Sequence, residues 1–144
     1  MAINKIKALT FDTVGTILNR YAGFYSEFKS IGNSYGLARD WHHITNEPRR
    51  RSLAKMINLG QNEPPEYNFD GAHKMVLDDL CQEFGLDIFS EEERNKIAFN
   101  VPHNFKVWDD FPEALVQLRK KFFCCSFTIL SFRIIMDTAK KNSL

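Results

Sequence analysis

The sequence predicts an α/β protein: an incomplete Rossmann-like parallel sheet core with an inserted helical cap. Two apolar, β-prone segments, IKALTFD at 6–12 and CCSFTILS at 124–131, indicate buried strands. A run of helical segments separates them, and a connection between parallel strands has to cross over the sheet. Because this connection is far longer than one helix, we expect residues 18–102 to form the cap and residues 1–17 and 103–144 to form the core.

Size and composition are those of an ordinary globular protein. The chain has 144 residues, which suits one domain or one small core with an insertion. Hydrophobic residues make up 44% of it and charged residues 26%, within the globular range. Nineteen basic residues nearly balance 18 acidic ones, which argues against a surface that binds nucleic acid or an anionic membrane.

Targeting and redox signals are also absent from the sequence. The N-terminal stretch MAINKIKALTFD lacks the apolar segment of a signal peptide, and no apolar run approaches the roughly 20 residues that span a bilayer. Three cysteines without a CxxC pair are typical of reduced thiols. We therefore expect a cytoplasmic protein with no nucleic-acid or membrane partner.

The first half of the cap is expected to hold two helices and a loop. Aromatic residues at helical spacing predict the first helix, over about 21–31; they are Tyr21, Phe24, Tyr25 and Phe28. The second helix lies within 40–60, with Pro48 near its start and Gly60 at its end. Its apolar stripe consists of Leu53, Met56 and Ile57. The stretch 61–68 contains paired prolines and is expected to be a loop.

The second half of the cap is expected to hold two more helices. One runs over about 69–84, where apolar residues recur every four positions and Gly85 supplies a stop. These residues are Ala72, Val76, Leu80 and Phe84. A capping box of Ser90 and Glu93 predicts the start of a short helix that reaches about Phe99.

The core is expected to continue with a helix over 109–122, the second strand and a last helix near Arg133. Asp109 or Asp110 caps the first of these helices and Pro112 lies in its first turn. The apolar stripe consists of Phe111, Leu115, Leu118 and Phe122. Cys124 and Cys125 are interpreted as buried residues of the strand.

Polar residues stand at the ends of both predicted strands. Asp12 ends the first strand and Ser131 ends the second. Ligands of open α/β sheets lie beyond the carboxyl ends of the strands, so neighbouring strands would point both residues into one crevice. Gly15 permits a tight turn after Asp12, and the turn amides with the Thr16 hydroxyl can hold an anionic group. The alternatives are a strand-end cap without chemistry for Asp12 and a helix N-cap for Ser131.

These motifs resemble those of a known family. FDTVGT at 11–16, followed by a helical insertion, resembles the first motif of the haloacid dehalogenase-like hydrolases. LDDLCQEFGLD, VWDDFPEALVQLRKKF and FTILSFRIIMDTAKKN resemble the type II (L-2-haloacid) dehalogenase branch, and the resemblance covers essentially the whole chain. The family's catalytic lysine and late acidic motif lie beyond the helix that begins near Arg133. The sequence is therefore expected to be the N-terminal portion of a larger, truncated enzyme.

The resemblance implies roles for individual residues. Asp12 would be the nucleophile, attacking the carbon that bears a halide and forming an ester that water hydrolyses. Thr16 would support the loop, and Ser131 would bind the substrate carboxylate or the Asp12 region. One arginine among Arg49, Arg50 and Arg51 would steer halide or carboxylate, and Arg50 is favoured. A small 2-haloacid is the expected substrate, and a homodimer is expected because family members often dimerise.

Departures from the family pattern define the alternatives. Phosphatases of the superfamily have a second aspartate where this chain has Val14, to protonate the leaving group and help hold Mg²⁺. Valine exchanges no proton and a departing halide needs none, so Val14 favours a dehalogenase without cofactor over an Mg²⁺-dependent phosphatase. Phe132 stands where the family has a substrate-binding asparagine. The third alternative is a truncated, non-catalytic binding module. The histidines show no metal-ligand spacing, so no metal is assigned.

Overall fold

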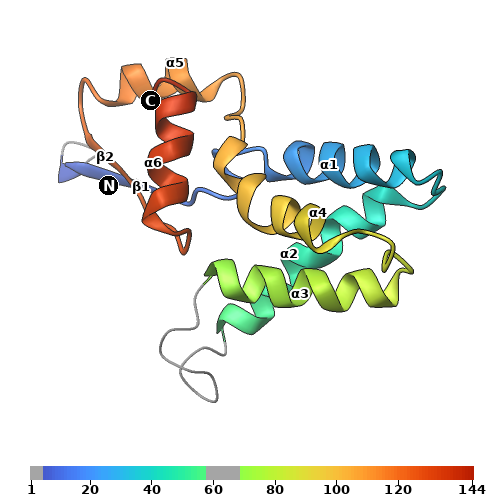
Figure 1. Cartoon of the computed structure of the whole chain (residues 1–144). Helices are drawn as coiled ribbons and strands as arrows, with labels where there is room; N and C mark the ends of the chain where they lie inside the picture. The colour runs from blue at the N-terminus through green and yellow to red at the C-terminus, as the bar shows by residue number, and fades with distance from the viewer. Residues whose placement is uncertain (1–4, 58–68) are drawn as a thin grey trace.

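The computed structural model describes residues 5–57 and 69–144 (Figure 1). Two strands form a parallel sheet, β1 (Ala8–Phe11) and β2 (Phe123–Ser126), in a register that pairs Ala8 with Phe123 and Phe11 with Ser126. The cap follows β1 and comprises α1 (Arg20–Ser34), α2 (Trp41–Ile57), α3 (Phe69–Glu83), α4 (Glu91–Asn95) and the π-helix η2 (Lys96–Asn100). A short 3-10 helix η3 (Pro102–Asn104), α5 (Phe111–Leu118) and α6 (Phe132–Lys141) complete the elements.

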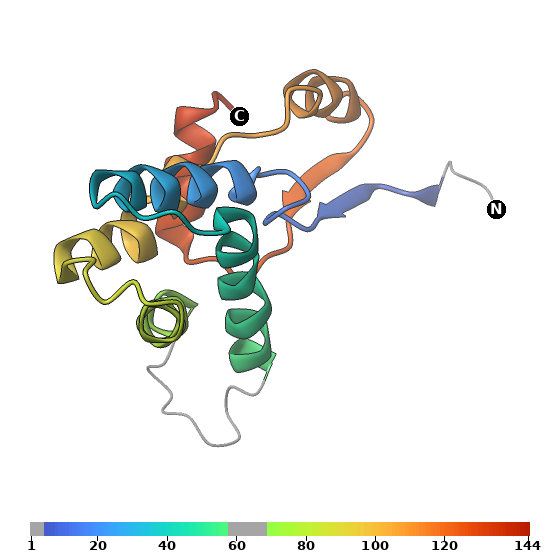
Figure 2. The same cartoon turned by 90° about the vertical axis from the view of Figure 1, so that its right-hand side faces the viewer.

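The cap helices pack closely on one another, and Figure 2 shows the strand pair projecting from them. Phe24 and Phe28 of α1 are 2% and 1% exposed, and they share one buried apolar cluster with Trp41 and Ile44 of α2. Gly32 lies so close to Trp41 that an added Cβ would stand 2.1 Å from the indole ring. The approach of α1 to α2 therefore requires glycine at this position.

The sheet contributes almost nothing to this buried cluster. No residue of β1 or β2 belongs to it, although Phe11 packs against its edge. One face of the sheet looks toward α5 and α6, across a cavity of about 290 Å³ lined by apolar residues of all these elements. Helix α6 is held at the base of the cap, because His103 Nδ1 lies 2.6 Å from Asp137 Oδ2 and Asn142 Nδ2 donates to the Phe105 carbonyl at 2.9 Å.

The prediction of two buried strands is wrong. Side chains along β1 are alternately exposed and half-buried, and Phe123 in β2 is 79% exposed. Cys124 is half-buried and Cys125 is exposed, so these cysteines are not core residues. The physical reason is that a two-stranded sheet lacks the neighbours at both edges and on both faces that bury strands in a full α/β core.

The second strand also ends earlier than predicted. It stops at Ser126, and residues 127–131 form a loop in which the Leu130 amide donates to Thr128 Oγ1 at 3.2 Å. Ser131 therefore lies at the N-cap position of α6 and not at the end of the strand. Helix α5 likewise ends at Leu118, short of the predicted 122, and its N-cap residue Asp110 makes no side-chain capping bond.

Most helix predictions are confirmed. The helix expected over 69–84 is α3, and the capping box of Ser90 and Glu93 is present at the start of α4. Helix α2 begins at Trp41, so Pro48 lies inside this helix and not near its start. Gly60 and the loop 61–68 lie outside the described residues. The division into a core of 1–17 and 103–144 and a cap of 18–102 stays a prediction.

Candidate active site

A tight turn presents Asp12 directly after β1. The Asp12 side chain is exposed, and Thr16 Oγ1 donates to its Oδ2 at 2.6 Å. Gly15 adopts φ +94°, and its amide donates to the Leu18 carbonyl at 2.9 Å. A residue with a side chain rarely adopts this φ, so the turn that brings Thr16 back onto Asp12 depends on glycine.

The chain that returns from the cap fixes this turn. The Trp108 indole Nε1 donates to the Gly15 carbonyl at 3.3 Å, and the Trp108 amide donates to the Ile17 carbonyl at 3.0 Å. Ile17 and Leu18 are buried in the apolar cluster while Thr16 remains exposed. The Asp12–Thr16 pair therefore lies at the surface of a turn that its buried neighbours and the Trp108 hydrogen bonds hold in place.

The Val14 side chain is buried in the protein, whereas the Asp12 carboxylate is exposed to solvent. It is 8% exposed and packs in the apolar cluster. Thr13 is 5% exposed, and its Oγ1 has no hydrogen-bond partner among the described residues. The two residues after Asp12 therefore present no second carboxylate beside it.

Ser131 lies on the loop that runs beside the end of β1. The Phe127 amide donates to the carbonyl of Phe11, the residue before Asp12, at 2.7 Å. Ser131 has the extended backbone of an N-cap (ψ 148°), but its hydroxyl makes no capping bond. Ser131 Oγ is buried and has no hydrogen-bond partner among the described residues. A buried hydroxyl without a partner costs free energy, so Ser131 Oγ is an unsatisfied polar atom of this loop.

The three arginines of α2 differ in their acidic partners: Arg50 and Arg51 both contact Glu47, and Arg51 also contacts Glu83. Arg50 is exposed and its guanidinium binds Glu47, with Arg50 Nη2 2.7 Å from Glu47 Oε2. Arg51 forms a bidentate pair with Glu83 at 2.6 and 2.8 Å. Arg50 and then Arg51 lower the pKa of Glu47 to about 2 against a desolvation effect that raises it. Arg49 is half-buried and makes no ion pair with a described residue.

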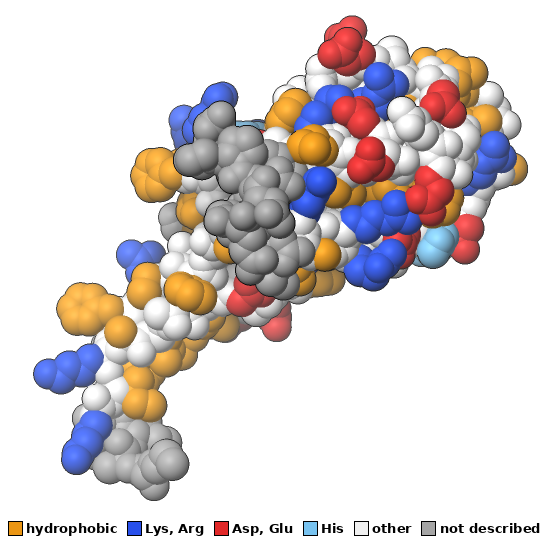
Figure 3. Space-filling model, turned by 90° about the horizontal axis from the view of Figure 1, so that it is seen from below, with side chains coloured by type: hydrophobic (Ala, Val, Ile, Leu, Met, Phe, Trp, Pro, Cys, Tyr) orange, Lys and Arg blue, Asp and Glu red, His pale blue; other side chains and the backbone are white. Residues whose placement is uncertain are grey.

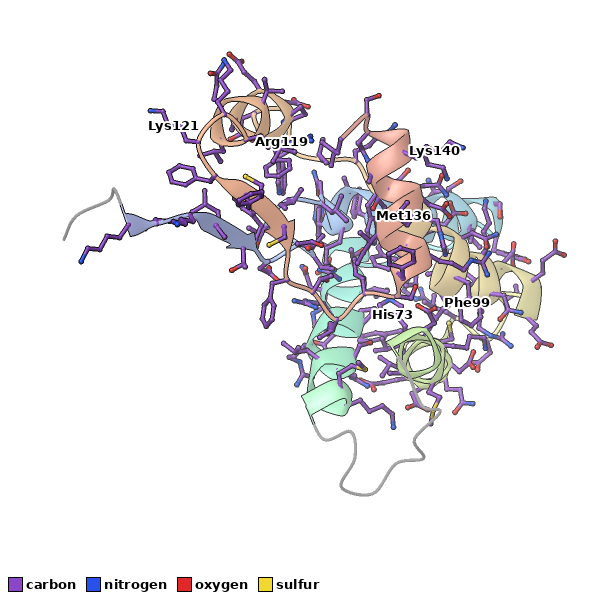
Figure 4. All side chains as sticks on the ribbon, turned by 90° about the vertical axis from the view of Figure 1, so that its left-hand side faces the viewer. His73, Phe99, Arg119, Lys121, Met136 and Lys140 are labelled. Atoms are coloured by element: carbon purple, nitrogen blue, oxygen red, sulfur yellow. The ribbon has the colours of Figure 1, made fainter. Side chains whose placement is uncertain are left out.

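Arg49 stands near a buried polar group inside the cap that the sequence analysis did not single out. Arg20 is 8% exposed, donates to the Thr45 carbonyl at 3.0 Å and lies over the Phe24 ring. The His73 imidazole stacks on the same Phe24 ring, with the ring centroids 5.1 Å apart. Its Nδ1 lies 3.3 Å from Ser52 Oγ. Figure 4 shows His73 among the cap helices.

Burial sets the protonation of this group. It lowers the pKa of Arg20 to about 10, with Arg49 as a second cause. It lowers the pKa of His73 to about 4, with Arg20 and Arg49 contributing, so the imidazole is neutral at pH 7. The helical period could have revealed Arg20, because it precedes Phe24 and Phe28 by one and two turns on the same face of α1.

The described part of the chain offers no group of three or more His, Cys, Asp or Glu side chains that could hold a metal ion. It also contains no helix that is both long and apolar enough to cross a bilayer. The 290 Å³ cavity behind the turn is lined by Thr13 and Phe11 but not by Asp12. The cavity is therefore separate from the carboxylate, which faces solvent at the strand end.

Comparison with known proteins identifies the fold. No family model matches the sequence, and no curated protein matches it significantly. The structure is similar to that of the defluorinating L-2-haloacid dehalogenase Rha0230, with a TM-score of 0.84 and 20% identity over 96% of this chain and 57% of that one. For the L-2-haloacid dehalogenase PA0810, the TM-score is 0.81 and the identity 20%, over 96% and 59%.

A third similar structure contains a covalently bound small molecule. It is the L-2-haloacid dehalogenase from Xanthobacter autotrophicus with chloropropionic acid covalently bound, with a TM-score of 0.76 and 16% identity over 96% of this chain and 53% of that one. The present chain thus spans little more than half the length of the solved enzymes that it matches. The predicted α/β fold class is confirmed. The chain has the fold of the L-2-haloacid dehalogenases, a helical cap inserted into a Rossmann-like core of which two parallel strands are described.

Proposed function

We propose that this chain carries the nucleophile and the cap of a hydrolase that cleaves the carbon–halogen bond of a small 2-haloacid. The observation that carries the proposal is the Asp12 carboxylate, held at the carboxyl end of β1 by the 2.6 Å bond from Thr16. This is the edge at which open α/β sheets bind ligands. The similar enzyme with covalently bound chloropropionic acid supports covalent chemistry on this fold.

The proposed reaction has two steps. An Asp12 oxygen attacks the carbon that bears the halogen, and the halide leaves with the electron pair of the broken bond. Water then adds to the carbonyl carbon of the ester, which releases a 2-hydroxyacid and a proton and restores the carboxylate. Thr16 orients the second Asp12 oxygen throughout. Because halide leaves without protonation, the buried Val14 beside Asp12 is compatible with the first step.

Two further residues are proposed to bind the substrate. The Ser131 hydroxyl is buried without a described partner, and a substrate carboxylate would satisfy it. Among the cap arginines we propose Arg49 in preference to Arg50, because Glu47 neutralises Arg50 whereas Arg49 has no acidic partner among the described residues. An unpaired guanidinium is the stronger ligand for halide or carboxylate.

The alternatives rest on specific features. An Mg²⁺-dependent phosphatase of the same superfamily would use the same Asp12, but Val14 supplies no proton to an alkoxide leaving group. A truncated, non-catalytic binding module is the other alternative; the chain spans 53–59% of the length of the solved dehalogenases that it matches.

The test is halide release from 2-chloropropionate by the purified chain, with and without Mg²⁺. Asp12→Asn should abolish release, while Asp87→Asn, an exposed acid of the cap, should leave it unchanged. Intact-mass spectrometry of the mixture should reveal an ester on wild type and none on Asp12→Asn. Release that survives Asp12→Asn would refute the nucleophile. A folded chain with neither release nor ester would support the binding module.

A further inference from the structure

Polar side chains from three helices meet in the interior of the cap. Thr45, Arg49 and Ser52 of α2 follow the i, i+4, i+7 spacing, so they share one face of this helix. Arg20 of α1 reaches that face, because its guanidinium donates to the Thr45 carbonyl at 3.0 Å. His73 of α3 reaches it at Ser52, with Nδ1 3.3 Å from Oγ. We call these five residues the cap polar cluster.

The positive charge of the cap polar cluster has no acidic counterpart in the described part of the chain. Arg20 is buried, and the bond to the Thr45 carbonyl is its one hydrogen bond to a described residue. Arg49 is half-buried and makes neither an ion pair nor a hydrogen bond with any residue of 5–57 and 69–144. The two guanidiniums are near enough that Arg49, after burial, is the second cause of the lowered pKa of Arg20. Buried like charges of this kind are costly unless an anion compensates them.

The outside of the cap is different, because its charges are balanced. Figure 3 shows acidic and basic side chains intermixed over the face of the cap that it presents. The next two residues of α2 illustrate this balance, since Arg50 and Arg51 both bind Glu47 and Arg51 also binds Glu83. The lack of a described carboxylate is therefore particular to the interior, where a charge most needs one.

A hydroxyl in the same cluster is also unsatisfied. Thr45 is fully buried, and its Oγ1 has no hydrogen-bond partner among the residues that the structure describes. Ser52 adds a second buried hydroxyl three residues beyond Arg49. Guanidinium groups are donors only and hydroxyls can donate, so the group that would complete this cluster is an acceptor with negative charge.

We propose that the cap polar cluster is a binding site for a small monovalent anion, chloride, held between Arg20 and Arg49 with the Thr45 and Ser52 hydroxyls as further donors. A compact single charge suits donors this deeply buried, because a larger or doubly charged oxyanion loses more hydration on entry. The anion would join α1 to α2 from within and so stabilise the cap.

This anion site goes beyond the proposed function and does not rest on the chemistry of Asp12. The Asp12 carboxylate is exposed and accepts from Thr16, and neither Arg20 nor Arg49 makes a hydrogen bond or ion pair with it. Arg49 is common to the two proposals, so a haloacid would compete with chloride for it. The test is therefore made without a haloacid.

Thermal unfolding of the full chain in sodium chloride and in sodium gluconate, at equal ionic strength, tests the proposal. An anion that binds only the folded state raises the melting temperature as its concentration rises. At about 0.2 M salt we expect a melting temperature about 3 °C higher in chloride than in gluconate. Broadening of the chlorine NMR signal by the folded protein reports the binding directly. Equal melting temperatures in the two salts, without broadening, would overturn the proposal.

Variants of single arginines locate the anion. Arg49→Met should abolish the difference between the two salts, and in gluconate it should melt no lower than wild type because it removes an uncompensated charge. Arg20→Met should abolish the difference as well. Arg50→Met is the matched control, since Arg50 is exposed and already paired with Glu47, and it should keep the full difference. A chloride effect that survives in folded Arg49→Met would overturn the proposed location.

The variant Asp12→Asn separates this proposal from the proposed function. It should keep the chloride effect, because the anion is proposed to lie inside the cap. Loss of the effect in Asp12→Asn would place the anion at the catalytic turn and would overturn the cap site. Halide release plays no part in these measurements, so failure of the dehalogenase chemistry would leave the result unchanged.

Discussion

The cap and the sheet contain the same kinds of side chain but bury them very differently. Phe24 and Phe28 in α1 are 2% and 1% exposed, whereas Phe123 and Phe127 around β2 are 79% and 76% exposed. A helix satisfies its backbone within itself and needs only one apolar face covered, which neighbouring helices do. A strand needs partners at both edges and cover on both faces before its side chains are buried. We therefore expect packing to stabilise the cap helices more than the two strands.

The sharpest test of this contrast truncates one phenylalanine in each region. Phe28→Ala should lower the free energy of unfolding by about 3–5 kcal/mol, because it leaves a cavity in the packed cap. Phe123→Ala should change it by less than about 0.5 kcal/mol, because its ring already contacts solvent. Urea unfolding followed by circular dichroism measures both. Comparable losses would mean that the Phe123 ring is covered in solution, for example by a second copy.

Acid should weaken the cap through His73. Its folded pKa is about 4 and its ordinary value 6.5, so the unfolded state takes up the proton first as the pH falls. Stability is complete above pH 6.5 and declines by up to about 3 kcal/mol as the pH falls to about 4. Arg20 and Arg49 face this imidazole and add to the effect, while Ser52 lies 3.3 Å from its Nδ1.

Unfolding free energies measured between pH 4 and 6.5 check this expectation. His73→Gln should flatten the dependence, since glutamine carries no titrating proton. His43→Gln, at an exposed position of α2, should leave the slope as in wild type. Identical slopes in wild type and His73→Gln would show that groups other than His73 govern the acid response in this pH range.

A smaller loss is expected from one added methyl group in the cap. Gly32→Ala would place its Cβ 2.1 Å from the Trp41 ring, so α1 and α2 must move apart. Overpacking of this kind costs about 1–3 kcal/mol, against the gain in helix propensity that alanine brings elsewhere. The comparison is Gly23→Ala, whose Cβ would stand 2.9 Å from the Phe105 ring and 3.5 Å from Val101 Cγ1, a smaller overlap than at Gly32. A thermal melt in which Gly32→Ala is no less stable than Gly23→Ala would refute the tight contact.

The same contrast explains which predictions from sequence succeed. Helix α3, the capping box of Ser90 and the turn around Gly15 depend on residues within a few positions of one another, so local patterns predict them. The burial of β1 and β2 depends on strands and helices that must come from elsewhere, and the prediction of buried strands is wrong. Apolar composition indicates what a segment would bury, not whether a partner is there to cover it.

The candidate site shows the same difference between residues that local patterns predict and residues that depend on distant contacts. Asp12 and Thr16 are four residues apart and the turn between them brings their side chains together. A local sequence pattern is enough to predict this pair. Deciding which arginine of 49–51 is available to a ligand requires knowing which of them pair with Glu47 and Glu83. The sequence spacing of the three arginines does not give this information. Arg20 was missed because a charged residue on an apolar helix face is easily taken for a surface residue.

The smallest expected effect compares two serines at helix starts, one in the cap and one in the core. Ser90 Oγ accepts from the Glu93 amide at 3.2 Å, so Ser90→Ala should cost about 1 kcal/mol. Ser131 occupies the same position of α6 but makes no capping bond and is buried without a described partner. Ser131→Ala should therefore leave the melting temperature unchanged or raise it, because it removes an unsatisfied oxygen. An equal loss in both variants would make Ser131 an ordinary cap. A loss only for Ser90→Ala, together with weaker binding of a 2-haloacid by Ser131→Ala, would mean that the hydroxyl contributes to ligand binding at the expense of stability.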